Sequence, residues 1–279
     1  QGVTENDLID FTPELRAEGL EIASWYKLGP IFTPPVVSNI DGPLGILMAP
    51  ATGGGTNWPG GSYDPETNIL YVSSNSSVTG LAVVPPYPGQ SDMAYIQGNA
   101  ATGPRTSGGA GSSVGGGRTE FSPAQRQRPQ SSRGTPPIGI RVQGLPLLKP
   151  PYGTISAIDL REGTIAWQIP HGQTPDRVAQ HPMLEGTDLP RTGQNASVGT
   201  LVTKTLLIAG EGELTVDENG VRRAMLRAYH KTTGTEVGAV ALPAPQSGSP
   251  MTYMLNGEQY IVLAVSGGGY SGELIALRL

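Results

Sequence analysis

The sequence predicts an all-β protein made of many short strands joined by tight turns. Glycine and proline are abundant (40 and 26 of 279 residues), and this density of helix breakers excludes a mainly helical chain. From residue 153 onward, short apolar and β-branched runs alternate with turn signals such as Glu162-Gly163, Thr233-Gly234 and Asn256-Gly257. This pattern is typical of a sandwich, a barrel or a propeller. The strands expected in this part are residues 154–158, 165–169, 201–209, 225–229, 236–242, 250–255, 259–265 and 273–279.

Composition excludes several classes of protein and site. The net charge is −5, whereas a nucleic-acid binder normally carries a basic excess. The chain has no cysteine, which rules out disulfides, cysteine zinc sites, cysteine nucleophiles and a CxxCH haem attachment. It also lacks an apolar run long enough for a membrane-spanning helix. The start at Gln1 resembles neither an initiator methionine nor a signal peptide, so we expect a processed form or a fragment whose export signal lies elsewhere.

Residues 7–27 are the one strong helix candidate. Thr12 is placed to cap the helix, Pro13 suits its first turn, and Gly29-Pro30 follows as a stop signal. Small and apolar residues recur at i, i+4, i+7 and i+11 from Leu15, which predicts one buried face. We expect a surface helix packed on the β body.

The segment between this helix and residue 85 reads as β structure. Residues 53–61 form a glycine-rich loop, residues 64–68 form a turn of Asp, Pro and Asn, and residues 69–72 form a buried strand.

Residues 98–137 are of low complexity, rich in Gly, Ser, Pro, Arg and Gln. Such a composition buries too little apolar surface to offset the entropy of ordering it. It predicts a long surface insertion, and its excess of arginine leaves a small basic anion-binding loop open as an alternative.

A compact repeat distinguishes between the all-β architectures. In residues 157–167 a strand enters, Asp159 is placed to bond backbone amides of the turn, Gly163 supplies a positive φ, and Trp167 lies on the returning strand. Residues 228–238 are a degenerate copy of this repeat, with His230 in place of the aspartate and Gly238 in place of the tryptophan. Residues 64–71 are a related strand–turn–strand.

This A-x-D-x-x-x-G-x-x-x-W unit resembles the tryptophan-docking repeat of the pyrroloquinoline quinone (PQQ) dehydrogenases, which are eight-bladed β-propellers. Residues 54–65 resemble the family's G-x-N-W segment, residues 144–153 resemble the approach to a docking repeat, and residues 249–270 resemble the closing blade. The likeness covers nearly the whole chain apart from 98–137, and it is to the C-terminal half of the family.

The resemblance implies a partial β-propeller over residues 1–279, made of C-terminal blades of an eight-bladed quinoprotein propeller, with the short helix 7–27 and the insertion 98–137. A blade takes roughly 40–60 residues, so the length suits about four or five blades. Because a partial ring leaves unpaired sheet edges, the missing N-terminal half of the propeller is an expected partner.

The resemblance also implies the cofactors PQQ and calcium, with the calcium ligands and the catalytic aspartate expected outside this chain. No catalytic residue or metal ligand is therefore nominated here. Four residues are candidates for cofactor binding: Asn57, Trp58, Gly269 and Tyr270. Structural roles remain open for all four: Asn57 as a turn cap, Trp58 in core packing, and a purely structural role for Gly269 and Tyr270. Tyr270 stands where some members have tryptophan.

Other catalytic motifs are missing. His171, His181 and His230 lack the spacing of a metal site. The chain has neither the G-x-S-x-G nucleophile elbow nor the G-x-x-x-x-G-K-[ST] phosphate loop.

The resemblance therefore implies the C-terminal part of a PQQ-dependent dehydrogenase that oxidises a sugar or alcohol by hydride transfer to PQQ. Electrons would pass to ubiquinone or a cytochrome c, in the periplasm, with the protein either free or associated with the inner membrane. The main alternative is a non-catalytic envelope β-propeller that serves as a protein-binding scaffold. The degenerate repeat at 228–238 is compatible with this alternative. A carbohydrate-binding β-sandwich is a weaker third reading.

Overall fold

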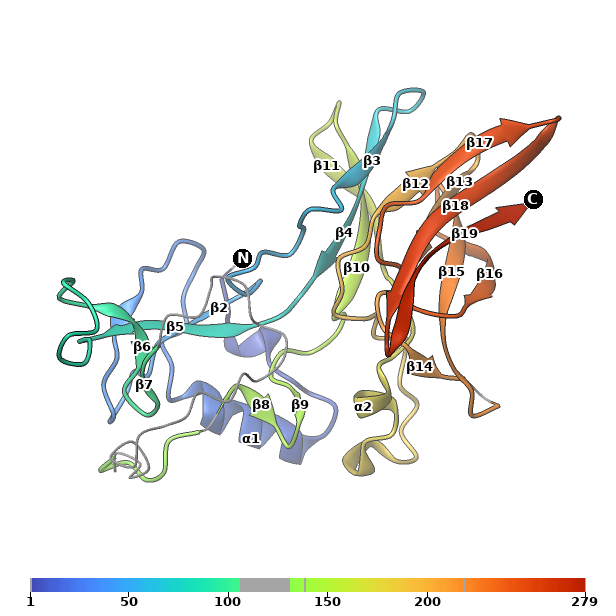
Figure 1. The fold of residues 1–279 in the computed structure, drawn as a ribbon. Helices are drawn as coiled ribbons and strands as arrows, with labels where there is room; N and C mark the ends of the chain where they lie inside the picture. Colours follow the sequence, from blue (N-terminus) through green and yellow to red (C-terminus); the bar gives the residue numbers. More distant parts are fainter. Residues whose placement is uncertain (1, 106–130, 138, 218, 279) are drawn as a thin grey trace. The chain divides into compact units, whose positions relative to one another are not determined.

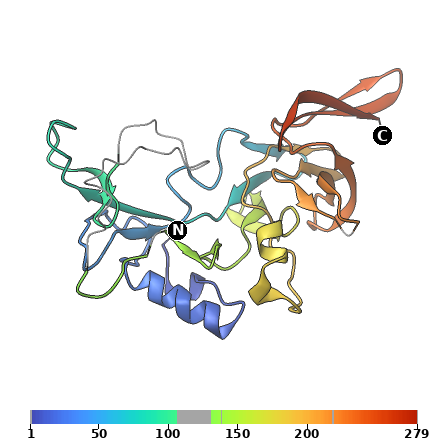
Figure 2. The same cartoon turned by 60° about the horizontal axis from the view of Figure 1, so that its bottom comes forward.

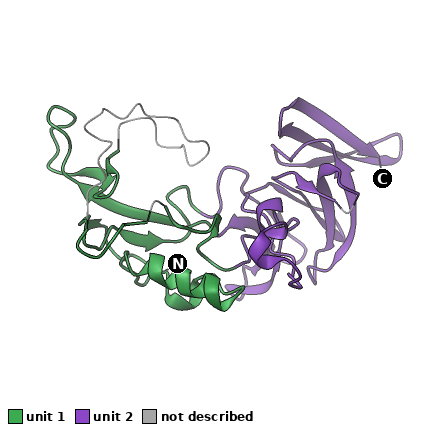
Figure 3. Cartoon of the chain, turned by 90° about the horizontal axis from the view of Figure 1, so that it is seen from below, with its two compact units in different colours: residues 1–54, 77–149 green, residues 55–76, 150–279 purple. Residues whose placement is uncertain are grey.

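A computed structural model describes residues 2–105, 131–137, 139–217 and 219–278. The chain forms two compact units, unit 1 with residues 1–54 and 77–149 and unit 2 with residues 55–76 and 150–279 (Figure 3). Most of the expected insertion, residues 106–130, lies outside the described residues. The assignment of residues 1–279 to one propeller domain stays a prediction.

Unit 1 contains the N-terminal helix and two small sheets (Figure 2). Its five-stranded sheet has the order β1-β5-β6-β7, with β2 also paired to β5, and β8 pairs with β9 in a hairpin. The elements are η1 (Glu5–Asp7), α1 (Pro13–Ala23), β1 (Val36–Val37), β2 (Ile46–Met48), β5 (Thr79–Val84), β6 (Ile96–Asn99), β7 (Gly103–Pro104), β8 (Arg141–Val142) and β9 (Leu145–Pro146).

The helix is shorter than the predicted 7–27. It begins as expected, because the Thr12 hydroxyl accepts a hydrogen bond from the Leu15 amide at 3.2 Å. Residues 8–12 before it are not helical, since the Ile9 amide instead donates to the Leu147 carbonyl at 2.7 Å. After Ala23 the chain pairs again, with Lys27 donating to the Gly45 carbonyl at 2.8 Å. Pairing with other segments thus limits the helix at both ends.

Unit 2 consists of three antiparallel sheets, here called sheets A, B and C (Figure 1). Sheet A has the order β11-β10-β4-β3, sheet B the order β12-β13-β15-β16 with β14 also paired to β15, and sheet C the order β17-β18-β19. The strands of sheet A are β3 (Gly61–Asp64), β4 (Ile69–Asn75), β10 (Gly153–Asp159) and β11 (Thr164–Pro170). Those of sheet B are β12 (Thr200–Val202), β13 (Leu206–Gly210), β14 (Thr215–Val216), β15 (Arg222–His230) and β16 (Glu236–Leu242). Those of sheet C are β17 (Met251–Leu255), β18 (Glu258–Gly267) and β19 (Tyr270–Arg278), and the short helices α2 (Asp176–Ala179) and η3 (Pro182–Leu184) lie between β11 and β12.

The three sheets stack through two apolar cores, and strand β13 shows why. Leu207 and Ala209 point into a core shared with Tyr71 and Ile155 of sheet A. Ile208, between them, points into the opposite core with residues of sheet C. Because successive side chains of a strand face opposite sides, sheet B is buried on both faces at β13. Antiparallel sheets stacked in succession are the architecture expected for part of a β-propeller, so the predicted fold class is confirmed.

Three turns of unit 2 share one geometry, as the sequence repeat predicts. Asp64–Asn68, Asp159–Gly163 and His230–Gly234 are each closed by the amide of the fifth residue donating to the carbonyl of the first, at 2.8, 2.8 and 2.9 Å. The fifth residue has φ of +59°, +66° and +73° respectively, a conformation that glycine and asparagine adopt most readily. The Asp159 carboxylate accepts from the Arg161 amide at 2.8 Å. The degenerate copy at residues 228–238 keeps the turn without an aspartate, because the backbone hydrogen bond from Gly234 to His230 is sufficient to close it.

One predicted strand is wrong. Residues 201–209 form two strands, β12 and β13, since the amide of Thr203 donates to the Leu206 carbonyl and the Leu206 amide donates to the Thr203 hydroxyl. A threonine hydroxyl that closes a turn breaks an otherwise continuous apolar run.

Within the described residues, no helix has the length and apolar character needed to cross a membrane.

Candidate functional site

The first strands of the three sheets lie along one side of unit 2. Each of β3, β12 and β17 is an edge strand of its sheet, and the Ser62 hydroxyl on β3 is hydrogen-bonded to the Thr200 hydroxyl on β12. The Thr200 hydroxyl also donates to the Tyr71 carbonyl at 3.4 Å. The loops that lead into these strands are therefore neighbours, and one of them is the predicted cofactor-binding segment.

Residues 55–60 form the loop that leads into β3, here called the Asn57 loop. Its first part is tied to sheet A, because the Gly55 carbonyl accepts from the Asn75 amide at 2.9 Å and the Thr56 hydroxyl donates to the Ser73 carbonyl at 3.2 Å. The segment is thus an ordered loop with a defined backbone path.

Asn57 shapes the turn at the tip of this loop. Its side-chain oxygen accepts from the Trp58 amide and its carbonyl accepts from the Gly60 amide, both at 2.9 Å. Gly60 takes a φ of +65°. The turn-capping role is therefore present, and the side-chain nitrogen Nδ2 of Asn57 has no partner among the described residues. That N–H group remains available to donate to a ligand.

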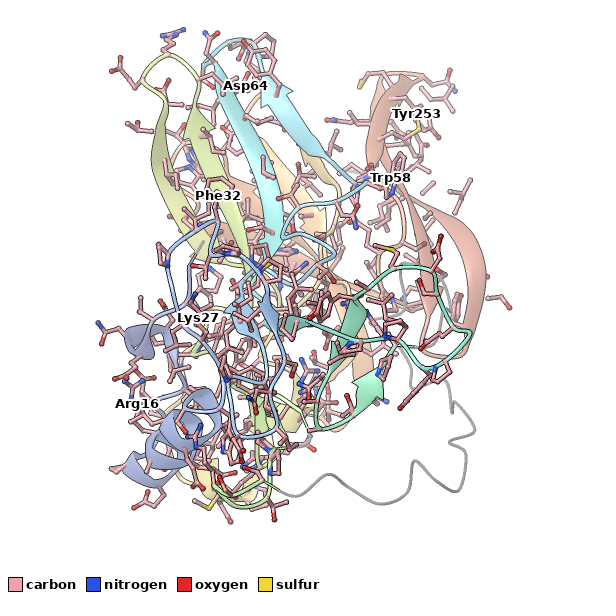
Figure 4. The ribbon with its side chains drawn as sticks, turned by 90° about the vertical axis from the view of Figure 1, so that its left-hand side faces the viewer. Arg16, Lys27, Phe32, Trp58, Asp64 and Tyr253 are labelled. Carbon is pink, nitrogen blue, oxygen red and sulfur yellow. The ribbon has the colours of Figure 1, made fainter. Side chains whose placement is uncertain are left out.

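Trp58 lies next to it and is 97% exposed. The alternative that it packs in the core is wrong. Figure 4 shows Trp58 on the loop leading into β3, beside β17, which carries Tyr253. The loop thus presents the indole with almost none of its apolar area buried by the described residues.

Gly269 and Tyr270 lie at the turn between β18 and β19. The three glycines 267–269 all have positive φ, and the Tyr270 hydroxyl donates to Glu273 at 2.8 Å. The turn contacts Leu214 and Pro245. Among the described residues, no contact joins this pair to Asn57 or Trp58, so the structure does not bring the four candidates together.

Trp167 has the docking role that the repeat predicts. Its Nε1 donates to the Lys231 carbonyl at 3.1 Å, and its ring lies 5.8 Å from that of Tyr71. A Cβ placed on Gly234 would lie 2.9 Å from Trp167 Cε3, so the indole of sheet A rests directly on the β15–β16 turn of sheet B. Large aromatic side chains are well suited to such an anchor.

A buried ion pair near this contact escaped the sequence reasoning. Lys231 Nζ lies 2.7 Å from Asp64 Oδ2, and both side chains are under 10% exposed. Burial alone would raise the pKa of Asp64, but hydrogen bonds from Lys231, Thr67 and the Glu66 amide lower it below its usual value. The hydrogen bond with Asp64 likewise raises the pKa of Lys231. Asp64 is committed to joining sheets A and B.

His171 is a second buried group of unit 2. Its Nε2 lies 3.0 Å from the Gly210 carbonyl, which only accepts, so Nε2 carries the proton and Nδ1 accepts from the Tyr229 hydroxyl at 2.9 Å. Burial lowers the pKa of His171 to about 4. This neutral histidine ties β11 to sheet B. Across the described residues, no group of three or more His, Cys, Asp or Glu is arranged to hold a metal ion.

Comparison with known proteins gives a consistent result. The family model for the β-propeller domain of PQQ-dependent glucose, ethanol and alcohol dehydrogenases matches residues 1–261. A glycerol dehydrogenase large subunit of Gluconobacter oxydans (strain 621H) is 30% identical over 241 residues, covering 85% of this chain and 28% of that protein.

Two further relatives have similar coverage. A probable quinate dehydrogenase (quinone) of Xanthomonas campestris pv. juglandis is 28% identical over 241 residues, covering 81% of this chain and 25% of that protein. A quinoprotein glucose dehydrogenase of Escherichia coli (strain K12) is 28% identical over 252 residues, covering 87% and 26%. The chain thus spans about a quarter of the length of the curated relatives it matches. With the family match extending over most of its residues, the chain belongs to the β-propeller domain family of the PQQ-dependent glucose, ethanol and alcohol dehydrogenases.

Proposed function

We propose that this chain is the C-terminal part of a PQQ-dependent dehydrogenase that oxidises a sugar or an alcohol. The family match and the relatives named above support the reaction class. The observation that supports a cofactor role for this chain is the Asn57 loop, which presents an unpaired amide N–H and a fully exposed indole side by side.

These two groups fit the chemistry of PQQ. The cofactor is a flat fused ring system with carboxylate and quinone oxygens, which accept hydrogen bonds. Asn57 Nδ2 would donate to one of these oxygens, and the Trp58 indole would cover part of the flat ring and exclude water from it. When bound, PQQ would supply the acceptor for a hydride from the substrate carbon. Asn57 and Trp58 would bind and orient the cofactor.

The remaining machinery would come from the rest of the polypeptide. Calcium belongs to the proposed cofactor set, and its ligands and the general base are assigned to parts of the protein beyond these residues. This assignment is supported by the finding that the chain spans only about a quarter of the length of its relatives.

The outer face of sheet C supports packing against a further sheet of the same propeller. On this face Tyr253 and Tyr260 stack at 5.3 Å with an interplanar angle of 8°. Met251, Leu255 and Leu274 beside them are all more than half exposed. Covering such an apolar face with another sheet is favourable, as sheets A and B already show.

The substrate would be a hydroxyl compound, and a sugar or polyol is favoured because the relatives are named for quinate, glycerol and glucose. We assign the electron acceptor to ubiquinone or a cytochrome c. We place the reaction in the periplasm.

The test is an activity assay on the full-length protein that contains this chain. With PQQ and calcium added, we expect reduction of an artificial electron acceptor on addition of glucose, glycerol, quinate or a simple alcohol. Omission of PQQ should abolish the signal. A folded protein that shows no PQQ-dependent reduction with any of these substrates would contradict the proposal.

A non-catalytic scaffold is the alternative, and one observation favours it. Gly238 stands where the docking repeat has tryptophan, and a Cβ built there meets nothing within 4 Å. The docking contact seen at Trp167 is therefore not repeated at this position of sheet B. This alternative predicts a folded full-length protein that binds no PQQ.

A further inference from the structure

We propose that Ser197 and Ser249 are positioning residues that hold the Asn57 loop in place for the cofactor. The inference rests on the proposed function and deepens it, because it assigns a role to residues just before the first strands of sheets B and C in a site whose proposed direct contacts lie on the loop that leads into sheet A. Two separate hydrogen-bonded contacts carry it.

The first contact is at the end of the loop. The Ser249 hydroxyl, just before β17, donates to the Pro59 carbonyl at 3.3 Å. Ser249 is itself set closely against sheet B, since a Cβ placed on Gly199 would lie only 2.7 Å from Ser249 Cα. Glycine at 199 thus permits the approach that brings the Ser249 hydroxyl to the loop.

The second contact is at the start of the loop. The Ser197 hydroxyl, just before β12, donates to the Gly55 carbonyl at 2.8 Å. The same hydroxyl accepts from Asn75 Nδ2 at 3.1 Å, and Asn75 Nδ2 also lies 3.2 Å from the Gly55 carbonyl. Ser197 therefore closes a small polar cluster that joins sheet B to both β4 and the loop.

The two contacts bracket the proposed cofactor groups. Gly55 and Pro59 lie on either side of Asn57 and Trp58, and each is held by a serine from the segment that leads into a different sheet. Neither serine reaches the tip of the turn, where Asn57 bonds Trp58 and Gly60. Their role is therefore to fix where the exposed amide and indole are presented, which lowers the cost of ordering them on binding.

The experiment replaces each hydroxyl in the full-length protein: Ser197→Ala, Ser249→Ala, and Ser197→Thr as a conservative variant that keeps a hydroxyl. Ser247→Ala is the matched control, because Ser247 lies two residues from Ser249 and its side chain has no hydrogen-bond partner among the described residues. Trp58 is observed by fluorine NMR of protein labelled with 5-fluorotryptophan, its signal being the one lost in Trp58→Phe.

We expect Ser197→Ala and Ser249→Ala to shift or broaden the Trp58 signal without changing the thermal midpoint by more than a few degrees, and Ser197→Thr and Ser247→Ala to leave it unchanged. We also expect the two alanine variants to bind PQQ about fivefold more weakly, the effect of losing one neutral hydrogen bond. An unchanged Trp58 signal in both alanine variants would overturn the inference.

The two readouts separate this inference from the proposed function. The Trp58 signal is recorded without PQQ and tests the loop contacts alone. If the unaltered protein binds no PQQ, the proposed function fails, and the Trp58 signal still decides whether the serines position the loop. If PQQ affinity is the same in all variants while the loop moves, the positioning role for the cofactor is refuted.

Discussion

Trp167 of sheet A and Lys231 of sheet B are joined by a hydrogen bond from the indole Nε1 to the backbone carbonyl, 3.1 Å long. The same carbonyl accepts from the Tyr71 hydroxyl at 3.1 Å. One backbone oxygen of the β15–β16 turn thus accepts hydrogen bonds from two aromatic side chains of the neighbouring sheet. The Asp64–Lys231 ion pair lies at the same turn, so Lys231 contacts sheet A through both its backbone oxygen and its side chain.

Removing the indole should weaken unit 2 substantially. We expect Trp167→Ala to lower the free energy of unfolding by about 3 kcal/mol, from lost burial and a cavity, and Trp167→Phe by about 1–2 kcal/mol, mainly from the lost hydrogen bond. Urea denaturation measures both. Trp58→Ala is the matched control, and because Trp58 is exposed its effect should stay within about 0.5 kcal/mol. Equal effects at the two tryptophans would contradict the docking role.

Gly234 should tolerate a methyl group much less well than Gly163. Both have positive φ, so alanine costs roughly 1 kcal/mol of backbone strain at either position. A Cβ at Gly163 meets open space, whereas at Gly234 it would lie 2.9 Å from the Trp167 ring. Gly234→Ala should therefore lower the free energy of unfolding by at least about 1 kcal/mol more than Gly163→Ala, the usual cost of overpacking. Similar values for the two variants would show that the ring moves aside freely.

Breaking the Asp64–Lys231 pair should be costly, because it leaves a buried charge unpaired. We expect Asp64→Asn to lower the free energy of unfolding by about 3 kcal/mol. Glu66→Gln serves as the control: Glu66 also faces Lys231, at 3.5 Å, but its side chain is 68% exposed, so its effect should be below about 0.5 kcal/mol. In the double variant Asp64→Asn with Lys231→Met, part of the loss should be recovered. No recovery would contradict the ion-pair account.

His171 should make the protein less stable in mild acid. Its pKa in the folded state is lowered to about 4 by burial, whereas that of an unfolded histidine is about 6.5. As the pH falls from 6.5 to 4, the unfolded state binds a proton that the folded state resists, so the free energy of unfolding falls by up to about 3 kcal/mol.

The measurement is urea denaturation of the unaltered protein and of His171→Gln between pH 7 and pH 4. The variant should be less stable at pH 7, because the bonds to Tyr229 and Gly210 are disturbed, but it should lack this part of the pH dependence. The neighbouring charges of Arg227, Arg191 and Glu236 are common to both proteins and cancel in the comparison. Parallel pH profiles would contradict the burial of a neutral histidine.

The sequence predicts the local features of this fold well and the long-range ones poorly. The Asp159–Gly163 turn follows from residue chemistry over a few positions, and the docking position of Trp167 was inferred from a family repeat. The Asp64–Lys231 pair, by contrast, joins two turns that are far apart in the chain, and neither residue is unusual in its local sequence. The exposure of Trp58 was likewise not predictable, because a glycine-rich loop does not reveal which way its indole points. The prediction of a single strand over residues 201–209 was wrong, because this apolar run contains a turn that one threonine hydroxyl closes.

The most direct test of the central claim is a titration of the full-length protein with PQQ in the presence of calcium. The account predicts that Asn57→Ala and Trp58→Ala each weaken PQQ binding by about tenfold, on the order of one lost contact to a bound group. Asn219→Ala, which removes an exposed amide in the β14–β15 turn of unit 2, should leave the affinity unchanged. If PQQ binds with the same affinity to all four folded proteins, the Asn57 loop is not part of the cofactor site.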